Sequence, residues 1–340
     1  MTAPMQPHRL PSDTTQLMQT VILALLPGIA VFLYQTGWGG VLNLCIATTA
    51  ACLAEAFALR LRQRNWLEGL SDYSAIITGL LIGLCLPPLI AWWIPALAAA
   101  FAILLAKHAY GGLGNNVFNP AMAGYALILV SFPRDLGIWL SQPDAFGTPL
   151  RFVLERVLNG GLVNYAQWDA LTGATALDLL RERSISINPL PDNLENLSGS
   201  FGAKHSEWQN LAYLAGGLWL LHKRIINWQI PVLVIASLSV CVIIETLASG
   251  SFSLPALGLH TFGGATILCA FFIATDPVSA AATKRGQLLY AGGIGLLLYL
   301  IRAYGGYPDG VAFAVLLMNC CVPLIDRIDL FFRSGTGRTS

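Results

Sequence analysis

Apolar residues along this chain come in long runs separated by short stretches that are polar or rich in proline and glycine. We count ten runs, each near the roughly 20 residues that an α-helix needs to cross a bilayer, at residues 17–35, 39–59, 73–90, 91–107, 117–132, 209–222, 230–248, 262–275, 287–302 and 309–325. Spanning β-strands would be about half as long and would alternate between apolar and polar residues. The pattern therefore predicts an all-α integral membrane protein with about ten transmembrane helices.

Composition agrees with a chain surrounded by a lipid bilayer. Of its 340 residues, 55% are hydrophobic and only 11% are charged, whereas soluble domains carry about 25% charged residues. A net charge of +1 gives no support for a nucleic-acid partner. The seven cysteines form no Cys-x-x-Cys pair, and no two of the five histidines have ligand spacing on a helix, so no metal or iron–sulfur site is expected.

Basic residues divide the connecting loops into two sets. With the amino terminus in the cytoplasm, the loops and tail on that side hold Arg60, Arg62, Arg64, Lys107, Lys223, Arg224, Lys284, Arg285, Arg327, Arg333 and Arg338. The opposite short loops hold only Arg302. The positive-inside rule therefore predicts that both termini are cytoplasmic and that the long interval 133–207 lies in a bacterial periplasm, beyond an inner membrane.

Internal repetition divides the chain into two halves. The tetrapeptide Ala-Tyr-Gly-Gly occurs at residues 109–112 and again at 303–306, and a proline interrupts an apolar run upstream of each copy. An odd number of spans in each half requires the halves to be inverted relative to each other, with broken helices near the midplane. We predict a first five-helix repeat at 1–132, a periplasmic loop at 133–207, a second repeat at 208–325 and a cytoplasmic tail at 326–340. Alternatively, the prolines only kink their helices.

The polar interval contains a candidate modification site, the heptapeptide Asp-Ala-Leu-Thr-Gly-Ala-Thr that ends at Thr175. It resembles the acceptor site of bacterial flavin transferases, which join the phosphate of FMN to the last threonine through a phosphodiester. Asp169 and Thr172 agree with this pattern, and Gly173 and Ala174 leave room for a bulky donor. By the motif alone, an ordinary helix start capped by Thr172 or Asp169 is the alternative.

A glycine-rich break after the fourth run holds a second group of candidates. Asn115, Asn116 and Asn119 carry amides that both donate and accept hydrogen bonds, and Gly112 and Gly114 allow close approach to a ligand. This segment is a candidate cofactor or ion site on the cytoplasmic side. A tight helix entry, with Asn119 as the cap before Pro120, explains the same residues.

Three acidic residues near apolar runs are candidates for an ion path, because ionised groups are costly at membrane depth. They are Glu55, Glu245 and Asp276. The structural alternatives are an ion pair between Glu55 and Arg60 and a capping role for Asp276.

Four long stretches together resemble one known family, the D subunits of Rnf electron-transport complexes, which are related to the B subunit of the sodium-pumping NADH:quinone oxidoreductase. The stretches are 107–122, 72–75, 271–279 and 308–317. The resemblance implies covalent FMN on Thr175, room for a non-covalent riboflavin, and no independent substrate turnover. It also implies partner subunits with iron–sulfur centres and flavins that pass electrons between ferredoxin and NAD, coupled to sodium or proton movement. A separate transferase would attach the FMN, using FAD.

Two other classes of protein fit the same hydropathy pattern. Ten spans with inverted halves and broken helices suit a small-solute permease without a redox centre, and a purely structural scaffold for partner subunits would also lack flavin. Covalently bound flavin distinguishes the electron-transfer subunit from both.

Overall fold

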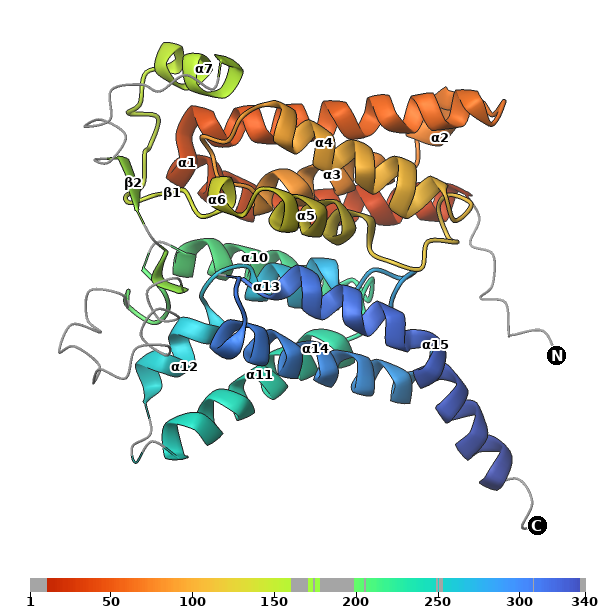
Figure 1. Cartoon of the computed structure of the whole chain (residues 1–340). Coiled ribbons are helices and arrows are strands. Elements are labelled where there is room, and N and C mark those ends of the chain that lie inside the picture. The colour runs from red at the N-terminus through yellow and green to blue at the C-terminus, as the bar shows by residue number, and fades with distance from the viewer. Residues whose placement is uncertain are drawn as a thin grey trace.

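The computed structural model describes residues 11–159, 171–173, 175–177, 199–204, 206–248, 250, 253–307 and 309–336, and it is mainly helical (Figure 1). The elements are α1 (Pro11–Leu61), α2 (Trp66–Leu70), α3 (Ser74–Cys85), α4 (Trp93–Phe101), η1 (Ala102–His108), α5 (Pro120–Ser131), α6 (Pro133–Leu136), β1 (Trp139–Leu140), α7 (Leu150–Asn159), β2 (Thr172–Gly173), α10 (Ser206–His222), α11 (Gln229–Ala248), α12 (Leu254–Thr261), α13 (Thr266–Leu268), η3 (Cys269–Ile273), α14 (Lys284–Tyr304) and α15 (Val311–Thr336). Elements η1 and η3 are π-helical. The helices α1 to α5 lie alongside α10 to α15 (Figure 1).

Helix α1 consists of two helices that meet at Gly37, where φ is 57° and ψ is −142°. This conformation is essentially restricted to glycine. The start of α1 and the start of α3 line the same cavity, whereas Asn43, just after the break, hydrogen-bonds to the carbonyls of Leu86 and Pro87 beyond the other end of α3. The two parts of α1 therefore form a hairpin, which accounts for the first two apolar runs.

Three helices in the described part of the chain are long and apolar enough to cross a membrane: Thr14–Leu61, Gln229–Ala248 and Lys284–Tyr304. A fourth is obtained if α12 and the α13–η3 segment, which are bent by 56° at a short break, are counted as one span. Further apolar helices are shorter, at Ser74–Cys85, Trp93–His108 and Pro120–Ser131. The structure is that of a helical membrane protein in which several apolar runs are short or interrupted.

Glycines let the helices pack closely. A Cβ added at Gly79 of α3 would lie 2.4 Å from the Cα of Thr48 in α1, and one at Gly216 of α10 would lie 1.9 Å from the carbonyl oxygen of Ala24. Both positions therefore require glycine, as is common where membrane helices touch. The second contact joins the two halves of the chain.

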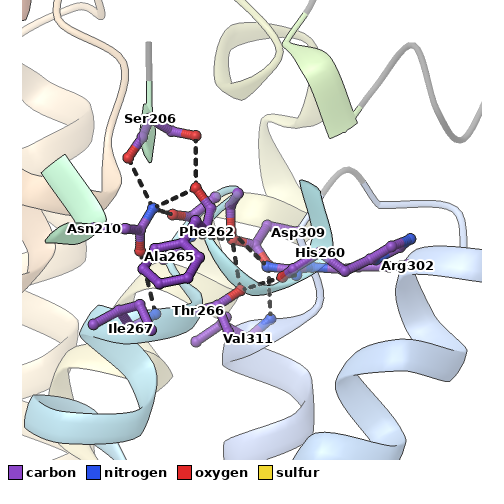
Figure 2. A network of polar contacts seen from close by, with 12 residues as sticks. Ser206, Asn210, His260, Phe262, Ala265, Thr266, Ile267, Arg302, Asp309 and Val311 are labelled. Carbon is purple, nitrogen blue, oxygen red and sulfur yellow. Dashed lines mark hydrogen bonds and ion pairs between the residues drawn. The ribbon is translucent and has the colours of Figure 1, made fainter. Parts of the chain in front are cut away.

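Side-chain amides satisfy the backbone where helices are interrupted. In a bilayer, carbonyls released at a break need partners within the protein. At the break between α12 and α13, the Asn210 amide nitrogen donates to the carbonyls of Phe262 and Gly264 at 3.1 and 2.9 Å, and its oxygen accepts from the N–H of Ile267 at 3.2 Å (Figure 2). The same nitrogen also donates to the carbonyl of Ser206 in its own helix at 3.0 Å. Asn43 serves the carbonyls that follow α3 in the same way. These interruptions are therefore built features of the fold.

A small antiparallel ladder and an amphipathic helix cover one end of the bundle. Trp139 of β1 lies opposite Gly173 of β2, and Leu140 lies opposite Thr172. Helix α7 packs Val153 and Val157 against Leu89. Thr172 is thus a strand residue, so the interpretation of Thr172 as a helix cap was wrong, because its backbone is paired with β1. Asp169 and Ala174 lie outside the described residues.

The two ends of the bundle differ. Helix α1 begins and α15 ends on the side of α2, while β1, β2 and α12 lie at the opposite end (Figure 1). The first Ala-Tyr-Gly-Gly segment follows η1 at the α2 end, and the second begins in the last turn of α14 at the β-strand end. The two copies of this segment therefore lie at opposite ends of the bundle.

Candidate functional site

Thr175 lies on the wall of a cavity of about 340 Å³ that is lined by β1 and by residues of both halves of the chain. We call it the hairpin cavity. Its lining includes four aromatic and three amide residues, which are Phe32, Tyr125, Trp139, Tyr213, Gln35, Gln142 and Gln209. Thr175 follows β2 by two residues and is half-buried. The cavity therefore offers apolar surface and polar groups next to a hydroxyl on a connecting segment.

The pairing of β1 with β2 holds the segment that precedes Thr175 beside this cavity. The N–H of Ser141 donates to the carbonyl of Leu171 at 2.9 Å, which extends the pairing of β1 and β2. A Cβ at Gly173 would lie 3.2 Å from the Cβ of Ser141, so glycine permits this close crossing. Trp139 and Leu140 of β1 line the cavity, whereas Thr172 and Gly173 do not. Of the two threonines in the motif, Thr175 is the one on the cavity wall.

Two charged residues line the hairpin cavity in the described part of the chain, Asp309 and Lys204. The Asp309 carboxylate accepts hydrogen bonds from Arg302 Nη2 at 3.1 Å, from the N–H of Ala265 at 3.0 Å and from the N–H of Val311 at 3.3 Å (Figure 2). Its charge is thus balanced by the buried guanidinium of Arg302. This agrees with a turn or capping role for Asp309.

A second cavity, of about 100 Å³, lies toward the α2 end, and we call it the junction cavity. Polar residues from both halves line it, namely Ser74, Thr78, Lys107, Asn116, Asn119, Thr275 and Asp276. The structure therefore brings together Asn119 and Asp276, which are 157 positions apart in the sequence.

Asn119 caps α5 and also joins the two halves. Its side-chain oxygen accepts from the N–H of Met122 at 3.1 Å, and its amide donates to the carbonyl of Ile273 at 3.2 Å. Its own N–H donates to Asn319 Oδ1 at 3.1 Å. The capping interpretation of Asn119 is confirmed. Asn115 is exposed, and it is the neighbouring Asn116 that lines the cavity.

Gly112, Gly114 and Asp276, which the sequence also suggested as site residues, have local structural roles. Gly112 and Gly114 have φ values of 102° and 90°, which non-glycine residues rarely adopt. Asp276 accepts hydrogen bonds from Ser279 Oγ at 2.7 Å and from the N–H of Val278 at 3.3 Å. It therefore caps the turn after η3 while lining the junction cavity.

Glu55 forms a buried ion pair, but not with Arg60. Lys107 Nζ lies 2.7 Å from Glu55 Oε2, and His108 Nε2 lies 3.0 Å from Glu55 Oε1. Lys107 also donates to Ser74 Oγ at 2.8 Å. The expected pairing with Arg60 was wrong, because the π-helical η1 brings both basic side chains to the carboxylate, and the guanidinium of Arg60 lies over the ring of Trp66.

Glu245 lies apart from these groups. It is exposed near the end of α11 and hydrogen-bonds to Tyr299 of α14. Glu55 pairs with Lys107, which lines the junction cavity together with Asp276. Two of the three acidic candidates are thus near this cavity, and Glu245 is not among its lining residues. Sequence reasoning had treated Lys107 only as a loop charge and had not singled out Lys204. The position of Lys107 at the end of an apolar run was the available signal that it would be buried.

Apolar helices, interruptions satisfied by internal polar groups and two cavities between the halves define a multi-helix integral membrane protein. Residues 3–330 match the model of the NQR2, RnfD, RnfE family. The chain belongs to this family, which confirms the resemblance found in its sequence.

Curated relatives extend over nearly the whole chain, and each is named as the D subunit of an ion-translocating oxidoreductase complex. The relative from Yersinia enterocolitica is 46% identical over 93% of this chain and 92% of its own length. The relative from Shewanella sediminis is 43% identical over 93% and 92%, and one from Escherichia coli is 41% identical over 92% of each.

Proposed function

We propose that this chain is the D subunit of an Rnf-type ion-translocating oxidoreductase complex and carries FMN covalently on Thr175. The observation that carries the proposal is the position of Thr175 on the wall of the hairpin cavity. Membership of the family and the names of the relatives support the assignment to a complex. The Thr-Gly-Ala-Thr motif supports the chemistry at Thr175.

The residues of the hairpin cavity suit a flavin. Its volume of about 340 Å³ lies at the lower end of the range of small-molecule sites, roughly 300–1,000 Å³. Tyr125, Trp139 and Tyr213 offer aromatic surface to a flat ring, and Gln142 and Gln209 carry amides for its polar edge. FMN attached there would supply electron transfer in one- or two-electron steps. The protein would hold the ring between the two halves and limit its contact with water.

Partner proteins follow from the same proposal. Subunits with iron–sulfur centres and further flavins would exchange electrons with the FMN, linking ferredoxin and NAD. A flavin transferase would use FAD to modify Thr175 after the segment reaches the periplasm. In this arrangement the chain does not turn over a substrate by itself.

We further propose ten spans in two inverted five-helix repeats within a bacterial inner membrane, with both termini in the cytoplasm. The location of the two Ala-Tyr-Gly-Gly segments at opposite ends of the bundle supports the inversion. The β-strand end, with Thr175, is then periplasmic, and the α2 end with its basic loops is cytoplasmic.

The junction cavity is the proposed place for an ion path; its volume of about 100 Å³ is below the roughly 300 Å³ at which small-molecule sites begin, so it does not enclose a riboflavin. Glu55 and Asp276 lie at this end, and Glu245 would act at the other end of the path. Asn116 and Asn119 line this cavity; the Asn119 amide donates to the carbonyl of Ile273 in the other half, and the Asn116 amide donates locally to the carbonyl of Phe118. Because Asn119 also holds α5 in place, Asn116→Leu is the cleaner variant. Unchanged ion coupling in Asn116→Leu would argue against this role.

The deciding experiment is in-gel flavin fluorescence of the denatured chain, co-expressed with its flavin transferase. We expect a fluorescent band in the parent and in Thr172→Ala, and none in Thr175→Ala. The intact mass of the parent should rise by that of FMN less one water. Thr172→Ala is a matched control, because it removes a hydroxyl from the same segment.

An unlabelled parent, with the transferase active on another substrate, would contradict the proposal and favour a permease. A band lost only in Thr172→Ala would show that the flavin is attached to Thr172 and not to Thr175.

A further inference from the structure

We infer that Lys204 is the cationic partner of the phosphodiester that joins FMN to Thr175. The inference rests on the proposed function and assigns a binding residue within it. Lys204 and Thr175 line the same hairpin cavity although they come from different segments of the chain. A phosphodiester carries one negative charge, and an ammonium group is a common protein partner for phosphate oxygens.

Charge balance in the cavity singles out Lys204. The other charged lining residue, Asp309, is neutralised by Arg302 and receives two backbone N–H bonds. The guanidinium of Arg302 is buried and also donates to the carbonyl of His260 at 2.8 Å, so it is committed to the fold. The described residues offer the ammonium of Lys204 no hydrogen bond or ion pair. Among the described residues, Lys204 is the cation at this cavity that remains available to an added anion.

A buried carboxylate fixes the loop that carries Lys204. Glu207 is 4% exposed and accepts the N–H groups of Ser200, Phe201 and Gly202 at 3.1, 3.0 and 3.1 Å. The N–H of Glu207 in turn donates to the carbonyl of Ala203 at 3.0 Å. These hydrogen bonds hold the loop of residues 200–203, immediately before Lys204, in one conformation.

Aromatic packing holds the same loop against the bundle. The ring of Phe201 meets those of Trp208 and Phe262 edge to face, with centroids 5.7 and 5.4 Å apart. The backbone at Lys204 is thereby fixed at the cavity, while its exposed side chain is free to turn toward a ligand. Glu207 is a positioning residue, and Lys204 is the binding residue.

An ion pair at this point would keep the tethered flavin in the cavity. Without it, the phosphodiester tether and the attached ring would spend more time in water. A partly exposed ion pair changes such an equilibrium by a factor of roughly two to five. The effect is sensitive to salt, because ions in solution screen exposed charges.

The test is the fluorescence anisotropy of the covalent flavin in the full, flavinylated chain in detergent. Lys204→Gln should shift the docked-to-mobile ratio roughly two- to fivefold toward mobile flavin and lower the anisotropy. Lys204→Arg should keep the parent value. Raising NaCl from about 0.02 M to about 0.5 M should lower the anisotropy of the parent and leave that of Lys204→Gln unchanged. Lys223→Gln, which removes an exposed lysine after α10, is the control and should behave as the parent.

In-gel fluorescence on the same samples separates this inference from the proposed function. Absence of covalent flavin from the parent would remove the proposed function itself. Flavin attached at Thr175 with equal, salt-independent anisotropy in the parent and in Lys204→Gln would overturn the role of Lys204 alone. If Lys204→Gln is not flavinylated, the salt response of the parent decides, and a flat response contradicts the inference.

Discussion

Glu55 and Lys107 form an ion pair in which both side chains are almost fully buried, at 3% and 2% exposure. Removing Lys107 leaves the buried Glu55 carboxylate with His108 in place of an ammonium partner, and breaking a buried ion pair typically costs about 3–5 kcal/mol. We therefore expect Lys107→Met to lower the free energy of unfolding by this amount. Glu55→Leu combined with Lys107→Met should be less damaging than Lys107→Met alone, because an apolar pair replaces the charges. Thermal unfolding in detergent measures both.

An exposed ion pair in the same chain provides the control. Arg151 and Glu155 lie 2.9 Å apart on α7 with side chains 91% and 51% exposed. Pairs of this kind contribute only about 0.3–0.5 kcal/mol. Arg151→Ala should therefore unfold close to the parent temperature. A double variant as unstable as Lys107→Met would show that the charges are not what makes this position sensitive.

Single residues show where the sequence was informative and where it was not. The cap at Asn119 follows from an asparagine before a proline, which is a local pattern. The partners of Glu55 depend on the π-helical register of η1, which places Lys107 and His108 beside it. A nearby Arg60 was the closest candidate in sequence, but the relevant neighbours were about 50 positions away. Local chemistry was predictable, and long-range pairing was not.

At the scale of elements, the interruption between α12 and α13 depends on one amide. Asn210 donates to three backbone carbonyls and accepts one N–H. Asn210→Asp keeps the acceptor for Ile267 but replaces the donor with a second acceptor. Each buried group left without a partner costs about 1–3 kcal/mol. We expect Asn210→Asp to lose at least this much stability, measured by the midpoint of thermal unfolding.

Asn227→Asp is the matched comparison, because Asn227 donates a single hydrogen bond to Gln287 Oε1 at 3.1 Å. It should lower the midpoint less than Asn210→Asp does. Equal midpoints for the two variants would mean that the carbonyls at the break find other partners.

The hairpin within α1 makes a second prediction at this scale. At Gly37 the backbone conformation excludes a side chain, and an added Cβ would lie 2.0 Å from Asp144 Oδ2. Gly37→Ala should therefore cost at least about 1–3 kcal/mol. Gly292→Ala lies in helix α14, where nothing lies within 4 Å of the added Cβ. It should be neutral or stabilising by up to about 1 kcal/mol. Thermal unfolding of both variants in detergent checks the contrast.

The elements themselves were predicted unevenly. Apolar runs located the helices well, because their length and composition are set by the bilayer. The run at 262–275 and the residues before it form two bent pieces instead of one helix, since Asn210 and Arg302 stabilise the released carbonyls. The β1–β2 ladder depends on pairing between segments about 30 residues apart. Each strand has only two residues, which is too short for an alternation of apolar and polar residues to predict it.

At the scale of the whole molecule, the predicted membrane class and family are supported by the helices and by the match over residues 3–330. The sequence predicted Thr175 as a modification site, which stays a prediction, but gave no sign that Thr175 lies beside a cavity shared by both halves. Residues of α1, α3, α5, α6, β1, α10, α13 and α15 line that cavity, and such packing cannot be read from separate apolar runs.

The orientation of the molecule gives a final prediction. Helix α7 with exposed Arg151 lies at the β-strand end, and exposed Arg64 lies in the loop before α2 at the opposite end. If the β-strand end is periplasmic, Arg151→Cys should react with a membrane-impermeant maleimide in cells whose outer membrane alone is permeable. Arg64→Cys should react only after the inner membrane is opened. The parent, with its native cysteines, sets the background. Labelling of Arg64→Cys before that step, with Arg151→Cys protected, would reverse the proposed topology and place Thr175 on the cytoplasmic side, where a periplasmic transferase could not reach it.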